Sequence, residues 1–501
     1  MSWKVWNRPT AAAVSTGPAR KYRRDDGKDT MVDTVIFWFR QDLRLADNPA
    51  LCAAAERGSV IPVYVLDLET AGDWRPGAAS RVWLRHSLKA LNASLRNKLR
   101  LYRGDAAKII PELARKHNAV SVHWNRCYEP WRIARDNALK ADLQEAGVNV
   151  ASDNGSLLWE PWEVLKDDGD PYRVFTPFYK KGCLSTAAPR KPLDKPELTL
   201  AQAEDDAMAV ALDELELLPK RDWGEAMMEN WQVGEDAALQ RLEDFIDDGL
   251  RGYKSGRNFP DRHNVSRLSP YLHYGEISPN TAWYAVKNSG DGADVDNFLS
   301  ELAWREFSYS MLYHFPELPE KNLQEKFDDF PWDQNAKRLR AWRRGQTGVP
   351  IVDAGMRELW QTGYIHNRVR MVVGSFLVKN LLLHWREGEA WFWNCLVDAD
   401  LANNSASWQW VAGCGADAAP YFRVFNPVLQ GQKFDGKGNY TRRWVPELAG
   451  MPDKWLFNPW EAPEDVLEKA GVKLGDAYPE PIVDLKGSRE RALKAFKQTK
   501  G

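Results

Sequence analysis

The spacing of apolar residues changes along the chain, from strand-and-helix alternation in its first third to helical periodicity in its second half. Residues 34–39, Thr-Val-Ile-Phe-Trp-Phe, form a continuous apolar run of the kind buried on both faces of a parallel sheet. Further strands are expected at 60–66, 99–103 and 120–124, with helices at 81–95 and 106–117. This alternation predicts an α/β domain with a doubly wound parallel sheet over residues 31–155. No Gly-x-Gly-x-x-Gly opens it, so the dinucleotide-binding fingerprint is absent.

From Gly234 onward the pattern is helical almost throughout. Helices are expected at 235–248, 278–288, 296–314, 353–362, 368–383 and 389–396. They predict an all-helical domain over residues 234–450, followed by a C-terminal tail at 451–501 with a basic helix at 488–497. Residues 156–233, rich in Pro and acid, are expected to form a long connector wrapping the surface.

The N-terminal residues 1–30 are expected to be an unstructured extension. Basic residues cluster at 20–24, and no acid precedes Asp25. A solvated tail, or an upstream start codon before a core that begins at Met31, is favoured over a transit peptide.

Composition excludes several classes of protein. Five widely spread cysteines offer no zinc or iron–sulfur spacing and suit a reducing cytosol, so we expect a cytoplasmic protein without a metal site. No apolar run is long enough to span a bilayer. The formal charge of −2 means that any nucleic-acid contact must come from a local basic patch. Tryptophan is the outlier, with 24 residues, most of which must serve packing.

Residues 398–410 carry the most informative set of polar and aromatic groups. At helical spacing Asp400, Asn404 and Trp408 share one face. An acceptor, an amide and an electron-rich ring in a row can hold a flat heterocycle by its edge and offer it an electron. Spacing alone favours the alternative, a buried helix with a few satisfied polar groups.

Four further segments combine charge with aromatic or hydroxyl groups. Each has a simpler explanation when taken alone: a helix cap, a solvated helix face or a tightly packed loop. The segments are 264–269, which could also bind an anion at a helix start; 301–307, which groups Glu301, Trp304 and Arg305; 366–371, which groups Asn367, Arg370 and Met371; and 417–427, which is aromatic and contains Arg423.

Read in order, these segments resemble the photolyase/cryptochrome family from Val32 to about Leu448. The matching motifs are Phe-Trp-Phe-Arg-Gln-Asp-Leu-Arg at 37–44, Ser-Arg-Leu-Ser-Pro-Tyr-Leu at 266–272, Glu-Leu-Ala-Trp-Arg-Glu-Phe at 301–307, Gly-x-Pro-Ile-Val-Asp-Ala-Gly-Met at 348–356, His-Asn-Arg-Val-Arg-Met at 366–371 and Trp-Gln-Trp-Val-Ala-Gly at 408–413. The amino-acid sequence at 81–88, 415–422 and 478–484 looks most like that of bacterial class III cyclobutane pyrimidine dimer photolyases.

The resemblance implies that the helical domain binds FAD in a folded form. The residues implied to hold it are Tyr253, Val265, Ser266, Arg267, Leu268, Ser269, Arg305 and Arg370 around the phosphates, Asp398 and Asp400 on the flavin and adenine side, and Asn404 facing flavin N5. An amide at that place resembles the DNA-repairing members and has no acidic proton to give to the flavin.

The implied activity is that of a deoxyribodipyrimidine photo-lyase, which repairs cyclobutane dimers by electron transfer from photoexcited reduced FAD. Members that repair (6-4) photoproducts look to carry histidines where this chain has Asn367 and Met371, and those histidines donate protons. Glu301 would hydrogen-bond the pyrimidine edge, and Trp304 and Trp410 would form the wall against which a flipped-out dimer packs.

The resemblance also implies a tryptophan relay and a DNA contact surface. Trp408, Trp385 and Trp332 match the family's electron-transfer triad, and Arg368 and Arg423 would bind phosphates around the lesion. The expected partner is UV-damaged DNA, bound by a monomer.

The antenna chromophore and the choice between repair and signalling stay open. At 128–132 the Asn-Glu pair typical of folate-binding class I enzymes is replaced by Trp131 and Arg132. A 5,10-methenyltetrahydrofolate antenna is favoured over 8-hydroxy-deazaflavin or an empty site. The alternatives to repair are a blue-light cryptochrome, disfavoured by the short tail after Gly450, and a DASH-type cryptochrome, disfavoured by the intact pocket residues.

Overall fold

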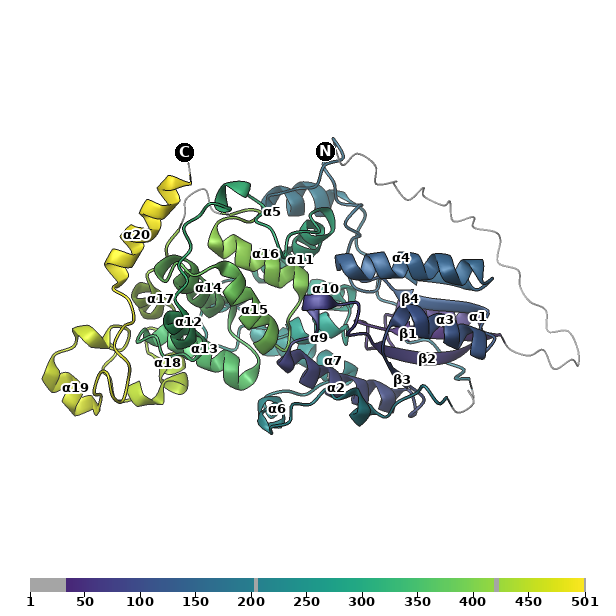
Figure 1. The fold of residues 1–501 in the computed structure, drawn as a ribbon, viewed down its shortest axis with the longest axis horizontal. Helices are drawn as coiled ribbons and strands as arrows, with labels where there is room; N and C mark the ends of the chain where they lie inside the picture. The colour runs from purple at the N-terminus through teal and green to yellow at the C-terminus, as the bar shows by residue number, and fades with distance from the viewer. Residues whose placement is uncertain (1–32, 202–205, 419–422, 500–501) are drawn as a thin grey trace, which may run out of the picture. The chain divides into compact units, whose positions relative to one another are not determined.

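A five-stranded, all-parallel sheet organises the N-terminal part of the chain (Figure 1). The computed structural model describes residues 33–201, 206–418 and 423–499, so the expected extension at 1–30 lies outside the described residues. The strands are β1 (Thr34–Phe39), β2 (Ser59–Leu66), β3 (Arg100–Arg103), β4 (Ser121–Asn125) and β5 (Asn149–Asp153), in the order β3-β2-β1-β4-β5. The doubly wound α/β fold is confirmed.

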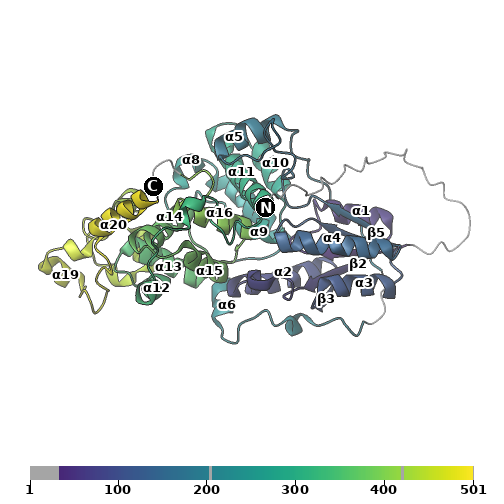
Figure 2. The ribbon, with the colours of Figure 1, turned by 45° about the horizontal axis from the view of Figure 1, so that its top comes forward.

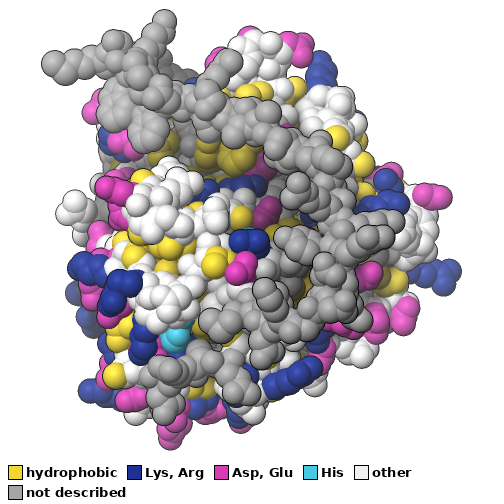
Figure 3. Space-filling model, turned by 90° about the vertical axis from the view of Figure 1, so that its right-hand side faces the viewer, with side chains coloured by type: hydrophobic (Ala, Val, Ile, Leu, Met, Phe, Trp, Pro, Cys, Tyr) yellow, Lys and Arg dark blue, Asp and Glu magenta, His cyan; other side chains and the backbone are white. Residues whose placement is uncertain are grey.

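Helices cover both faces of this sheet, as the strand sequences require. Successive side chains of a strand point to opposite sides, so Ile36 and Trp38 join one buried cluster, whereas Val35 and Phe37 join the other. The first cluster includes residues of α3 (Ala106–Lys116) and α4 (Pro130–Glu145), and the second those of α1 (Pro49–Arg57) and α2 (Ala78–Ser94). The face seen in Figure 3 mixes basic and acidic side chains, in keeping with the small net charge.

The second half of the chain is helical, as predicted. Its helices are α7 (Glu235–Asp244), α8 (Tyr253–Gly256), α9 (Ser269–Tyr274), α10 (Pro279–Asn288), α11 (Ala293–His314), α12 (Ala336–Arg343), α13 (Pro350–Thr362), α14 (Asn367–Ser375), α15 (Trp385–Cys395), α16 (Leu401–Ala412), α17 (Pro427–Phe434) and α18 (Asn439–Trp444). The tail adds α19 (Glu464–Ala470) and α20 (Leu485–Gln498), drawn in yellow-green and yellow in Figure 2.

Two helix boundaries differ from the prediction in an informative way. The helix expected at 368–383 ends as α14 at Ser375 and continues as a π-helical turn over Phe376–Asn380. α15 begins at Trp385 rather than at residue 389, because the His384 side chain accepts a hydrogen bond from the Arg386 amide and caps the helix.

Part of the segment expected to wrap the surface is instead buried. Trp159 and Phe178 are 5% and 1% exposed, and the Glu306 carboxylate accepts hydrogen bonds from the amides of residues 158 and 159. The segment carries two short helices, α5 (Phe175–Pro177) and α6 (Trp223–Met228). It therefore contributes to the core between the sheet and the helices.

The α/β and helical parts belong to one compact unit, residues 33–501. The Arg44 guanidinium donates to the carbonyls of Gly155 and Gly275, and Glu276 accepts from Trp83 and Ser87 of α2. In residues 33–201, 206–418 and 423–499, no helix is long and apolar enough to cross a membrane.

Candidate functional site

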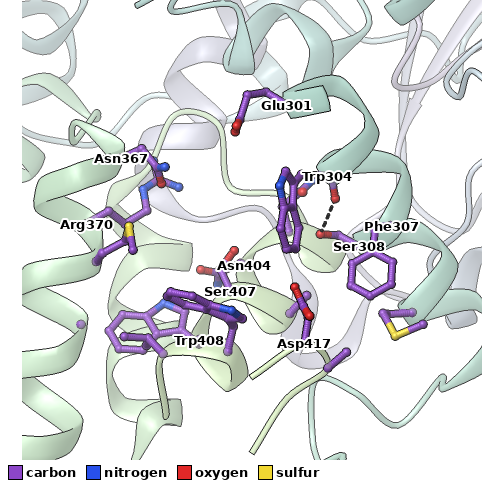
Figure 4. Close-up of a pocket in the computed structure, with 18 of the residues that line it drawn as sticks. Glu301, Trp304, Phe307, Ser308, Asn367, Arg370, Asn404, Ser407, Trp408 and Asp417 are labelled. Atoms are coloured by element: carbon purple, nitrogen blue, oxygen red, sulfur yellow. Dashed lines mark hydrogen bonds between the residues drawn. The ribbon is translucent and has the colours of Figure 1, made fainter. Parts of the chain in front are cut away.

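A cavity of about 460 Å³ lies among α11, α14, α15 and α16 (Figure 4). It is lined by the following predicted residues: Glu301 and Trp304 of α11, Asn367, Arg368, Arg370 and Met371 of α14, and Asn404, Trp408 and Trp410 of α16. Three segments that lie far apart in the sequence thus converge on one space.

Helix α16 places its polar and aromatic face toward this cavity. Asp400 caps the helix by accepting from the Asn403 amide at 2.8 Å, and Gly413 ends it with a φ of 96°. Asn404, Ser407 and Trp408 then line the cavity at i, i+3 and i+4 spacing. The Asn404 side-chain N–H donates to the carbonyl of Glu389 at 3.1 Å, which leaves its carbonyl oxygen free to accept.

Helix α14 contributes a cluster of positive charge and a neutral histidine. His366 caps this helix, because its Nδ1 accepts from the Arg368 amide at 3.2 Å. Burial lowers the pKa of His366 to about 3, and the nearby arginines, including Arg257 and Arg370, push it in the same direction. The imidazole is therefore uncharged at neutral pH and cannot act as a proton donor beside Asn367.

Glu301 forms an ion pair with Arg257, a residue that the sequence prediction missed. Burial raises the pKa of the Glu301 carboxyl, and Arg257 opposes this. Arg257 and Asn258, which also line the cavity, follow the four-residue helix α8. Such a short element has no apolar period, and the available signal was that Arg257 lies one helical turn after Tyr253.

Arg370, which lines the cavity, and its ion-pair partner Asp398, which lies outside the lining, keep polar atoms that no protein group among the described residues satisfies. Within the described residues, the Arg370 Nε and the Asp398 Oδ1 are buried without a hydrogen-bond partner, although the two side chains lie 3.6 Å apart as an ion pair. Arg257, Arg368 and Arg370 all line the cavity, so positive charge is concentrated there. Unsatisfied buried groups of this kind call for a polar ligand.

Several predicted residues lie outside the cavity. Arg305 donates to the Ser156 carbonyl at 2.7 Å and lies over the ring of Tyr309, whose hydroxyl donates to Asp400. The exposed Arg423 offers its backbone carbonyl to Lys379.

The predicted phosphate-binding group also lies apart from the cavity lining. It consists of Tyr253, Val265, Ser266, Arg267, Leu268 and Ser269. Within this group, the Arg267 guanidinium lies over the ring of Tyr364, 4.7 Å from its centroid.

Of the three tryptophans predicted to form a relay, Trp408 lines the cavity and Trp385 is the first residue of α15. A Cβ at Gly388 would lie 2.0 Å from the Trp408 ring, so this glycine allows Trp408 to pack directly on the helix that begins at Trp385. His384 bridges the outer step, since its ring centroid is 5.6 Å from that of Trp385 and 5.0 Å from that of Trp332.

The structure adds further lining residues that the sequence prediction missed, among them Phe307, Ser308, Ser407 and Asp417. Asp417 is the first residue of the aromatic segment 417–427, from which the sequence predicts only Arg423 as a site residue. Its carboxyl points toward Trp304 and Ser308 in Figure 4.

A second, smaller cavity of about 80 Å³ adjoins the sheet. Trp38, Trp131, Arg132 and Arg135 line it together with Trp393 of α15. The two residues that depart from the class I folate pattern, Trp131 and Arg132, therefore both face this space.

Comparisons with known proteins agree over nearly the whole chain. The model of the family described as DNA photolyase matches residues 35–197, and that of the FAD binding domain of DNA photolyase matches residues 298–498. The chain is 50% identical to a deoxyribodipyrimidine photo-lyase of Agrobacterium fabrum, over 93% of this chain and 98% of that protein. It is 39% identical to cryptochrome-2 of Arabidopsis thaliana, over 93% of this chain and 79% of that protein.

A solved structure shares the fold. The crystal structure of a bacterial class III photolyase from Agrobacterium tumefaciens has a TM-score of 0.89 at 48% identity, over 96% of this chain and all of that chain (100%).

Proposed function

Because the chain belongs to the photolyase/cryptochrome family, we propose that it is a deoxyribodipyrimidine photo-lyase that splits cyclobutane pyrimidine dimers in DNA with light. The observation that carries this proposal is the convergence of Glu301, Trp304, Asn367, Met371 and Trp410 on one cavity.

The cavity residues suit a pyrimidine dimer that has left the DNA helix. The Glu301 carboxylate accepts a hydrogen bond from a pyrimidine N3–H, and Trp304 and Trp410 supply flat apolar walls. Chemistry on a base inside such a cavity requires the base to be flipped out of the stack, as in enzymes that act on single bases of DNA, among which photolyases are a standard example. A damaged pair stacks poorly, so its extrusion costs less than that of an intact pair.

The same residues disfavour repair of (6-4) photoproducts. Such repair needs a proton donor beside the lesion, and neither Asn367 nor Met371 can donate a proton at neutral pH. The neighbouring His366 is neutral, and its Nδ1 is engaged by the Arg368 amide. Splitting of a cyclobutane dimer needs only the transfer of an electron to the dimer and its return to the flavin, and these residues permit both steps.

Arg370 and Asn404 of the cavity, together with Asp398, the ion-pair partner of Arg370, fit FAD. The free Arg370 Nε suits a phosphate or ring carbonyl, and the Asp398 Oδ1 suits a hydroxyl or amide donor. The Asn404 carbonyl, fixed by its hydrogen bond to Glu389, suits the N5 edge of the flavin. Reduced FAD supplies, on excitation, the electron for the dimer.

Residues behind the cavity are proposed to complete the cofactor site. Arg267 and the backbone of 265–269 are assigned to the phosphates, together with Tyr253. Asp400 caps α16, and its carboxylate also accepts a hydrogen bond from the Tyr309 hydroxyl. The Arg305 guanidinium lies over the ring of the same tyrosine, so Arg305 and Asp400 lie close to each other.

Trp408, Trp385 and Trp332 are proposed to deliver electrons that reduce oxidised FAD. The close packing of Trp408 on α15 and the position of His384 between the outer two indoles support this path.

Arg257, Arg368 and Arg423 are proposed to bind the phosphates around the lesion. Local neutralisation of a few phosphates is compatible with the overall charge of −2. We further propose that the protein acts as a monomer in the cytoplasm, where bacterial DNA is reached directly; light scattering of the purified protein tests the first point.

A methenyltetrahydrofolate antenna is proposed for the second cavity. The Trp131 ring at the cavity wall suits a pterin ring, and Arg132 suits its anionic tail. The chromophore released by heating the purified protein tests this, because folate and deazaflavin have different absorption spectra.

Repair itself is tested with an oligonucleotide that contains one thymine cyclobutane dimer. The photoreduced protein should restore it under blue or near-UV light and not in the dark, and should leave a (6-4) substrate unchanged. A protein that binds reducible flavin and repairs neither lesion would instead be a photoreceptor of the cryptochrome type.

A further inference from the structure

One face of the Trp304 indole is covered by a ring from a distant part of the chain. Phe175 stacks on it with a centroid distance of 3.7 Å and an interplanar angle of 9°. Phe307 meets both rings edge-on, at 5.8 Å from Trp304 and 6.0 Å from Phe175. The opposite side of Trp304 is left to line the cavity.

Phe175 is itself held by a residue of the cavity wall. The Asp417 amide donates a hydrogen bond to the carbonyl of Arg173, two residues before Phe175, at 3.0 Å. Asp417 adopts a φ of 50°, in the left-handed region that Asp enters more readily than most residues with a side chain. The Phe175 side chain is only 8% exposed.

We propose that Phe175 is a positioning residue that fixes the plane of Trp304, so that the free face of the indole is preset to receive a flipped-out pyrimidine dimer. The inference rests on the proposed function of the cavity and deepens it. An indole backed by a parallel ring cannot rotate toward the side of Phe175. The Trp304 side chain therefore already has its binding conformation before the lesion arrives, and binding does not have to order it.

The test compares Phe175→Leu with the conservative variant Phe175→Tyr. Leucine keeps the site apolar but offers no flat surface, whereas tyrosine retains the ring. Tyr179→Leu is the matched control, because Tyr179 stacks on Phe175 at 5.9 Å and, within the described residues, makes no ring contact with Trp304. Each variant is measured for binding to a dimer-containing duplex and to the same duplex without damage.

We expect Phe175→Leu to raise the Kd for the dimer duplex about three- to tenfold, the scale of one aromatic contact. Its affinity for undamaged duplex, which depends on the arginines, should be unchanged, and so should the yield of repair per absorbed photon at saturating substrate. Phe175→Tyr and Tyr179→Leu should bind the dimer within about twofold of the wild type.

Unchanged dimer affinity in Phe175→Leu would overturn the inference. So would equal losses on damaged and undamaged DNA in both Phe175 variants, because that result would mean a general loss of structure. A wild-type protein that fails to prefer the dimer duplex would refute the proposed function itself, and is recognised before any variant is measured.

Discussion

The carboxylate of Glu301 forms an ion pair with the guanidinium of Arg257, and both side chains line the same cavity. Burial favours the neutral form of Glu301, and Arg257 favours the charged form. This pair therefore sets the pH range in which Glu301 can accept a hydrogen bond from a substrate.

Replacement of Arg257 by glutamine should move the low-pH limit of dimer binding to higher pH. Without the arginine, burial acts alone on the carboxyl, so Glu301 takes up a proton at a higher pH than in the wild type. The measurement is the Kd for a dimer-containing oligonucleotide from about pH 5.5 to about pH 8.5, a range in which folded proteins are generally stable. Arg262→Gln is the control, since Arg262 lies over Phe259 rather than beside Glu301; it should leave the pH profile unshifted. Parallel profiles for wild type and Arg257→Gln would contradict this role.

Loss of the middle indole should separate photoreduction from repair. In Trp385→Phe, light should no longer reduce oxidised flavin in the presence of an external donor, because the path from Trp408 outward is broken. Repair by the chemically reduced variant should be retained. Trp393→Phe on the same helix should photoreduce normally, because Trp393 faces Trp74 and hydrogen-bonds to Arg75. Photoreduction that survives in Trp385→Phe would exclude this relay.

Arg368 should contact one phosphate of the DNA backbone, whether or not the DNA is damaged. Arg368→Gln is expected to weaken binding of damaged and undamaged duplex alike and to reduce the slope of log K against log salt by about 1. Arg368→Lys should keep the slope, because it keeps the charge, even though it loses the hydrogen bond to Asn258. A loss confined to damaged DNA would point to a contact with the lesion instead.

Glu276 should make stability depend on pH. Burial raises its pKa to about 8, although Ser87 and Trp83 donate to it, whereas an unfolded glutamate titrates at about 4.3. The folded state thus holds a proton that the unfolded state releases, and the stabilisation is lost as pH rises from about 4.3 to about 8. Between pH 5 and 8.5 the wild type should lose free energy of unfolding on the order of a few kcal/mol more than Glu276→Gln. Urea denaturation checks this, and equal losses would show that Glu276 is ionised in the folded protein.

The spacing of apolar residues predicted a strand or helix correctly where the element is buried on both faces or where its buried residues recur at a regular period. The run at 34–39 gave β1 at its observed bounds, because both of its faces meet helices. β5 was missed, since Asn149–Asp153 is polar and only partly buried at the sheet edge. The burial of Phe175 was also missed, because local sequence cannot show that a ring will meet Trp304 of another segment.

The candidate site was predicted less completely than the fold. Residues on long helices, such as Asn404 and Trp408, could be grouped from spacing, because the helix places them on one face. Arg257 and Asp417 belong to short or irregular segments, and only tertiary packing brings them to the cavity. The position of Arg305 outside the cavity lining likewise depends on a backbone carbonyl, that of Ser156, which no motif records.

The most direct test of the account is the action spectrum of repair. Purified protein with fully reduced FAD is mixed with excess dimer-containing oligonucleotide, and dimers split per incident photon are counted from the near-UV to the blue. We predict a yield that follows the absorption of the reduced flavin and of any antenna, that is absent in the dark, and that falls strongly in Glu301→Ala. Splitting in the dark, or no splitting at any wavelength with flavin reduced, would contradict it.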